Sequence, residues 1–285
     1  MKTKTPSALN FFSATDLNDH FSAIVNRRPA LSPLDLDELV NLPPLQTLDQ
    51  QFTFRTVTML DINIALCRTF STSIGHDNIT LPMIKKGITT LGPYMLVFMN
   101  KSLITGICPS SLAHKSPLSK TSHPASSNDA RLVALLPELS KLAERIVQYQ
   151  LMEFIQVNKL LSSHQSCNKK GRSTQTALIG VLDDAKWAIE QRMVTILVLF
   201  DFSKAFDCIP HKLLLTKLQM MGITGTPLRW FFNYLQGRQQ AVRITRARHS
   251  DYRPIASGVP QGTLLGPIMY GLFSSDLPRV LIRAT

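Results

Sequence analysis

The sequence has 285 residues, of which 44% are hydrophobic and 18% charged, and its formal net charge is +12. This composition excludes a disordered or fibrous chain and is sufficient for one large domain or two modest ones with a hydrophobic core. The longest apolar run, residues 193–200, is far shorter than the ~20 residues of a membrane-spanning helix. We therefore expect no membrane segment.

The four cysteines are widely spaced, at Cys67, Cys108, Cys167 and Cys208. None forms a Cys-x-x-Cys pair, and none lies near a histidine at the spacing of zinc ligands. We expect reduced thiols, no zinc, and an intracellular location in the nucleus, the cytoplasm or both.

The charge is distributed unevenly along the chain. Residues 1–50 hold four basic and six acidic side chains, a net −2, whereas residues 210–285 hold ten basic and two acidic ones, a net +8. Such asymmetry favours a polyanionic partner at the C-terminal end. A basic surface without a function is the alternative that charge alone leaves open.

The first hundred residues predict mainly helices. Residues 1–50 lack sustained periodicity and predict a linker with one short helix, marked by Phe11, Leu17, Phe21 and Ile24. A helix is expected to begin at Asp61, and a second one to cover residues 81–101 with a break at Gly92-Pro93.

The middle of the chain alternates a breaker segment with strong helices. Serine and proline dominate residues 109–128, which predict a loop or hairpin. Apolar residues recur at helical spacing over residues 137–160, so an amphipathic helix is expected there. A basic turn at residues 169–172 precedes a further helix over residues 173–191.

The last third begins with the continuous apolar run 193–200, which predicts a strand buried on both faces. Two helices are then expected, from Pro210 to Gly222 and from Thr226 to Gly237. The alternating residues 240–245 predict an exposed strand. A loop of glycine and proline at residues 257–262 leads into a helix at 264–274.

The first candidate for chemistry is Asp201, which ends the predicted buried strand. A charge partly removed from water is costly unless it is paired or bound to a metal ion. A binding role and a turn-capping role both remain open for Asp201. For Asp207, which precedes Pro210, entry into the next helix is the favoured interpretation.

The second candidate is the loop Ser257-Gly258-Val259-Pro260-Gln261-Gly262. Its two glycines allow the backbone to approach a ligand, and the helix that follows is expected to offer free N–H groups. Gln261 can both donate and accept hydrogen bonds. An ordinary tight turn is the alternative, and the basic surroundings together with Asp201 favour a site.

Two segments carry a family resemblance: Leu199-Phe200-Asp201-Phe202-Ser203-Lys204-Ala205-Phe206-Asp207, and the loop above extended by Thr263-Leu264-Leu265-Gly266-Pro267. Together they resemble the reverse transcriptases of non-LTR retrotransposons, Jockey-like elements above all. Further matches follow in the family's order at residues 135–147, 160–166, 170–174 and 228–238. The resemblance covers roughly residues 50 to 285.

The resemblance implies an α+β fold, the fingers and palm of a right-hand polymerase. Residues 1–50 would be an N-terminal linker or tail, residues 51–175 the fingers, and residues 176–285 a partial palm with an antiparallel sheet packed on helices. The thumb would be absent. The partners implied are an RNA template, a DNA primer and deoxynucleoside triphosphates.

The resemblance also implies roles for residues of the reaction centre. Asp201 would be a catalytic carboxylate that binds two Mg²⁺ ions, with the carbonyl of Phe202 as a further metal ligand. Phe206 would be the steric gate that selects deoxynucleotides, and Gln261 and Gly262 would contact the nucleotide and the template.

Basic residues would bind phosphates by the same resemblance. Arg131 would grip the triphosphate, with Lys120 as a second candidate for that task. Lys169, Lys170 and Arg172 would lie against the template phosphates.

The sequence departs from the family at several points. Around Arg131 it reads Ala-Arg-Leu-Val-Ala, where the family usually has Tyr-Arg-Pro-Ile-Ser. The Tyr-Ala-Asp-Asp hairpin, which supplies the second metal-binding carboxylate in the family, is not found. We therefore expect this chain to be inactive as an isolated polypeptide. The alternatives are a retroelement relic that binds nucleic acid without catalysis and an unstable pseudogene product.

Overall fold

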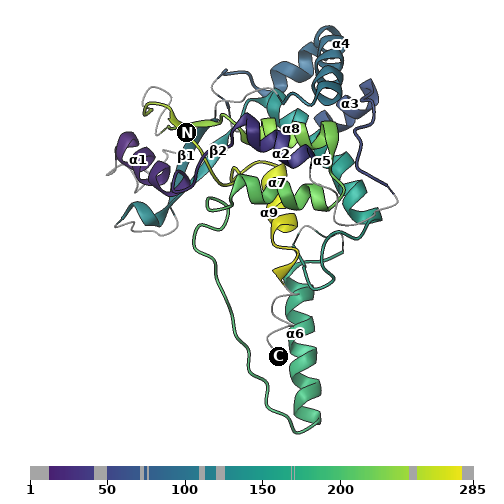
Figure 1. The fold of residues 1–285 in the computed structure, drawn as a ribbon, viewed down its shortest axis with the longest axis vertical. Coiled ribbons are helices and arrows are strands. Elements are labelled where there is room, and N and C mark those ends of the chain that lie inside the picture. Colours follow the sequence, from purple (N-terminus) through teal and green to yellow (C-terminus); the bar gives the residue numbers. More distant parts are fainter. Residues whose placement is uncertain are drawn as a thin grey trace, which may run out of the picture.

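Helices make up most of the computed structural model, which describes residues 13–41, 50–70, 74–75, 77–108, 113–119, 126–167, 169, 171–243 and 249–277 (Figure 1). The helices are α1 (Ala14–Val25), α2 (Pro33–Asn41), α3 (Met59–Cys67), α4 (Leu81–Thr105), α5 (Glu138–Val157), α6 (Thr174–Glu190), α7 (His211–Met220), α8 (Gly225–Leu235) and α9 (Leu265–Phe273), with the short 3-10 turn η2 (Ser127–Asp129). The strands are β1 (Ala113–Ser119), β2 (Ala130–Leu135), β3 (Gln239–Val242) and β4 (Arg253–Pro254). Among these residues no helix combines the length and the apolarity needed to cross a bilayer.

The four strands form one small sheet in the order β2-β1-β3-β4. β1 and β2 are antiparallel, as are β3 and β4, whereas the central pair β1 and β3 is parallel. β1 lies within residues 109–128, where a loop or hairpin was expected, and pairs with β2, which begins beyond that range at Ala130. The prediction of an exposed strand at 240–245 was wrong about exposure, because β3 lies inside the sheet and Ala241 and Val242 are fully buried.

Helix α1 covers part of this sheet. Leu17, Phe21 and Ile24 are buried in one cluster with Leu132 of β2 and Val242 of β3. Ser13 caps the helix by accepting a hydrogen bond from the N–H of Asp16 at 3.0 Å. The expected helix around Leu17 and Phe21 is confirmed, while α2 was not predicted.

The main core is formed by the helices α3, α4, α5, α7, α8 and α9, whose apolar side chains make one continuous cluster. The helices expected over 137–160, 173–191, 210–222, 226–237 and 264–274 are confirmed as α5 to α9. The break expected at Gly92-Pro93 was wrong, because α4 continues through Pro93. A Cβ on Gly92 would lie 2.6 Å from Cε of Met59, so glycine allows α3 and α4 to pack closely.

Helix α6 and the segment after it extend away from the rest of the molecule in Figure 1. The prediction of a buried strand at 193–200 was wrong: these residues have irregular backbone and are exposed, Val194 to 89% and Phe200 to 75%. An apolar, β-branched run favours extended backbone, but a strand also needs a neighbour with which to pair. Among the described residues no strand pairs with this segment.

Candidate functional site

The loop 257–262 is packed against two parts of the chain that are distant in sequence. Gly258 and Gly262 have φ angles of +86° and +89°, which side chains other than glycine rarely adopt. A Cβ on Gly258 would lie 2.7 Å from the carbonyl oxygens of Phe206 and Asp207. A Cβ on Gly262 would lie 2.6 Å from Cγ1 of Val133 in β2. Both glycines are therefore required for close packing.

Backbone hydrogen bonds fix the same loop on both sides. The N–H of Val259 donates to the carbonyl of Phe206 at 2.7 Å, and the N–H of Gly258 donates to that of Ile209 at 2.8 Å. On the opposite side the N–H of Ala134 donates to the carbonyl of Gln261 at 2.8 Å. The loop thus connects the segment after Asp201 with strand β2.

A buried histidine is hydrogen-bonded to the backbone of the loop 257–262. His211, at the start of α7, is 3% exposed, and its Nε2 lies 2.7 Å from the carbonyl oxygen of Gly258. Burial lowers the pKa of His211 to about 4, so the ring is neutral near pH 7. A carbonyl oxygen can only accept, and Nε2 therefore carries the proton and donates it.

The predicted nucleotide residues Phe206, Gln261 and Gly262 lie together at this loop. The ring of Phe206 packs on that of Tyr270 in α9, with 4.9 Å between the ring centroids. Nε2 of Gln261 lies 3.5 Å from Oδ2 of Asp207, at the long end of the hydrogen-bond range. The Gln261 side chain therefore faces Asp207, to which the sequence had assigned only a helix entry.

Asp201 and Phe202 do not occupy the place expected for them. Because residues 193–200 do not form a strand, Asp201 does not lie at a strand end in a sheet, and both side chains are exposed. Phe202 lines an apolar pocket of about 320 Å³ together with Tyr270 and Cys208. Among the described residues no cluster of three or more His, Cys, Asp or Glu side chains could hold a metal ion.

Arg131 lies on the strand face that meets the loop. Side chains alternate along a strand, so Arg131 and Val133 share one face of β2, and Val133 is the residue that Gly262 approaches. The Arg131 side chain is exposed. Lys120, the second candidate for the triphosphate, lies outside the described residues.

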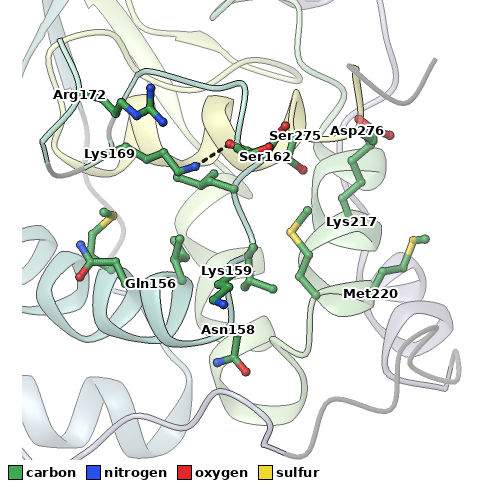
Figure 2. Close-up of a pocket in the computed structure, with 16 residues that line it drawn as sticks. Gln156, Asn158, Lys159, Ser162, Lys169, Arg172, Lys217, Met220, Ser275 and Asp276 are labelled. Atoms are coloured by element: carbon green, nitrogen blue, oxygen red, sulfur yellow. Dashed lines mark hydrogen bonds and ion pairs between the residues drawn. The ribbon is translucent and has the colours of Figure 1, made fainter. Parts of the chain in front are cut away.

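Two of the three predicted template residues, Lys169 and Arg172, line a basic pocket of about 900 Å³ between the C-terminal ends of α5 and α7 and the chain after α9 (Figure 2). Lys159, Lys169 and Arg172 form no ion pair within the described part of the chain. Nζ of Lys169 donates to the neutral carbonyl of Ser162 at 2.7 Å, so its charge is not compensated. Lys217, on the opposite wall, is paired with Asp276 at 2.7 Å. Lys170 lies outside the described residues.

Comparison with known proteins identifies the family of this chain. The profile of the family "Reverse transcriptase (RNA-dependent DNA polymerase)" matches residues 118–285, which is more than half of the chain and includes the loop, β2 and the basic pocket. The chain belongs to this reverse transcriptase family.

Curated relatives point to mobile elements. The chain is 31% identical over 152 residues to the probable RNA-directed DNA polymerase from transposon X-element of Drosophila melanogaster, a match that covers 52% of this chain and 16% of the relative. It is 30% identical over 158 residues to the RNA-directed DNA polymerase from mobile element jockey of the same species, covering 54% of this chain and 17% of the relative. The chain thus spans about a sixth of the length of these relatives. The expected Jockey-like, non-LTR reverse transcriptase resemblance is confirmed.

One buried residue next to the loop of this reverse transcriptase chain was not predicted from the sequence as part of the site. Glu144 of α5 is 3% exposed, and its carboxylate accepts hydrogen bonds from the Tyr234 hydroxyl at 2.7 Å and from the N–H of Leu264 at 2.8 Å. The expectation of free N–H groups at the start of α9 was therefore wrong. A signal existed, because Glu144 lies three and seven residues before the buried Val147 and Leu151, on the apolar face of the helix.

Proposed function

We propose that this chain contains the template- and nucleotide-binding part of an RNA-directed DNA polymerase from a non-LTR retroelement. In this proposal residues 51–175 are the fingers and residues 176–285 are part of the palm. The loop 257–262 carries the argument, since it is hydrogen-bonded both to Phe206 and to β2. Residues assigned to nucleotide selection and to triphosphate binding thereby belong to one packed unit.

Each wall of the proposed site has its own task. Phe206 would reject a ribose 2′-hydroxyl by occupying its space, while Gln261 and the backbone at Gly262 would contact the base pair being formed. Arg131 would bind the triphosphate from the β2 face, where a planar guanidinium suits phosphate oxygens. The basic pocket would bind template phosphates through Lys169 and Arg172.

Divalent metal ions would supply charge stabilisation in the intact family's reaction. Asp201 is the proposed ligand, and Mg²⁺ commonly binds through one or two carboxylates together with substrate phosphates. Among the described residues no group of three or more His, Cys, Asp or Glu side chains is placed to hold a metal ion, so we derive no catalytic step from them. The proposal concerns binding and selection.

The test is the stability of a complex with an RNA template annealed to a DNA primer. We expect the next complementary deoxynucleoside triphosphate, added with Mg²⁺, to slow dissociation of the complex, and the three non-complementary ones to have little effect. Four equal dissociation rates would contradict nucleotide selection by this chain.

A second candidate is nucleic-acid binding without nucleotide selection. The uncompensated charges of the basic pocket favour it, because they suffice for phosphate binding on their own. The same experiment separates the two, since this candidate predicts salt-sensitive template binding that no nucleotide changes.

A further inference from the structure

The first turn of α9 is fully engaged by the protein itself. The N–H groups of Leu264 and Leu265 donate to the Glu144 carboxylate, and the N–H of Gly266 donates to the Thr263 hydroxyl at 3.0 Å. Pro267, the next residue, carries no N–H. The helix start that directly follows the Gln261 loop therefore binds a buried side-chain carboxylate where a ligand anion could have bound.

Glu144 is itself held in place by Tyr234 of α8 and by Arg238, three residues beyond the end of that helix. The Tyr234 hydroxyl donates to it at 2.7 Å, and the Tyr234 ring stacks on Trp230 with 5.6 Å between centroids. The Arg238 guanidinium lies 4.9 Å from the centre of the Tyr234 ring and contributes a positive charge near the carboxylate. Tyr234 and Arg238 are 4% and 5% exposed, so this network is shielded from water.

Burial alone would disfavour a charged Glu144. Burial raises the pKa of the Glu144 carboxyl, while the hydrogen bonds from Tyr234 and Leu264 and the charge of Arg238 oppose that shift. A buried carboxylate that accepts hydrogen bonds from two elements fixes their relative position, because losing either donor leaves it unsatisfied.

We propose that Glu144 and Tyr234 are positioning residues for the nucleotide site: they fix the start of α9 and, through it, the loop that carries Gln261 and Gly262. This inference rests on the proposed function. It also assigns triphosphate binding to side chains such as Arg131, because the first turn of α9 has its N–H groups already bound.

The test begins with hydrogen exchange of the full chain without ligand. Glu144→Gln removes the charge and keeps the shape, and Tyr234→Phe removes one donor. We expect exchange at residues 263–266 to accelerate about tenfold or more in Glu144→Gln and less in Tyr234→Phe. Glu153→Gln, on an exposed position of the same helix, is the matched control and should leave this exchange unchanged. Equal exchange in Glu144→Gln and Glu153→Gln would overturn the proposal.

A second readout distinguishes positioning from general stability. We expect Glu144→Gln to weaken binding of the complementary deoxynucleoside triphosphate about tenfold, and to leave template–primer affinity within about twofold of the unchanged chain. Parallel loss of both affinities would indicate general destabilisation and overturn the positioning role. If the unchanged chain binds no nucleotide, the proposed function fails, while the exchange rates still decide whether Glu144 holds the loop.

Discussion

The backbone N–H of Ala134 donates to the carbonyl oxygen of Gln261 at 2.8 Å. This hydrogen bond joins a strand near the middle of the chain to a loop more than a hundred residues later. A second hydrogen bond, from the N–H of Val259 to the carbonyl of Phe206, joins the same loop to the segment that carries Phe206.

Replacing Gly262 should destabilise the loop. In Gly262→Ala the new Cβ would meet Val133 at 2.6 Å, and alanine would have to adopt a φ of +89°. Left-handed backbone alone costs an L-residue roughly 1–2 kcal/mol, and the contact adds to this. Thermal unfolding is the measurement. The control is Gly171→Ala, with a φ of +76° and nothing within 4 Å of its Cβ; equal losses in both variants would show that the Val133 contact is unimportant.

Stability should depend on pH through His211. Its pKa is about 4 in the folded chain and about 6.5 when unfolded, so the unfolded state binds the proton more tightly between these values. The contribution of neutral His211 to the free energy of unfolding is fully present above pH 6.5. It decreases as the pH falls toward 4, by up to about 1.4 kcal/mol per pH unit. Urea unfolding at several pH values should show a smaller slope in His211→Gln than in the unchanged chain. Parallel slopes would contradict a buried neutral histidine.

The basic pocket should produce a measurable salt dependence of RNA binding. Each phosphate contact to a single strand contributes about 0.7 to the slope of log affinity against log salt. We expect Lys169→Ala and Arg172→Ala each to lower that slope by about this amount. Lys85→Ala, on the exposed side of α4, is the control. If neither pocket variant changed this slope, the pocket would not be a binding site for template phosphates.

Phe206 should determine the choice between deoxyribose and ribose. Phe206→Ala would open the space that a 2′-hydroxyl needs, and we expect the preference for a deoxynucleotide over its ribonucleotide to fall about tenfold or more. Competition binding of the two nucleotides measures this ratio. Phe70→Ala is a suitable control, since this side chain is 91% exposed and lies outside the proposed site. A ratio that falls equally in both variants would refute the gate.

Much of the helical framework could be predicted from the sequence, because the spacing of apolar residues along the chain indicates which face of a helix is buried. The amphipathic residues of α5 gave its position to within a few residues. The failures involve partners that local sequence does not specify. The run 193–200 is apolar enough for a buried strand, yet it has no neighbouring strand among the described residues.

In the candidate site, too, some features could be predicted from the sequence and others could not. The loop 257–262 could be found because glycines at positive φ leave a sequence signature. The sequence did not show which carboxylates contact this loop and the helix after it. It favoured Asp201, whereas Asp207 faces Gln261 and Glu144 accepts a hydrogen bond at the start of α9. Their roles depend on contacts between distant segments, and spacing along the chain does not reveal such contacts.

The most direct measurement is hydrogen exchange across residues 257–266 in the presence of an RNA template, a DNA primer, Mg²⁺ and single deoxynucleoside triphosphates. We predict that the complementary nucleotide slows exchange in this loop and in β2, and that a non-complementary nucleotide does not. Unchanged exchange with every nucleotide, although template and primer are bound, would contradict the assignment of this loop to nucleotide binding.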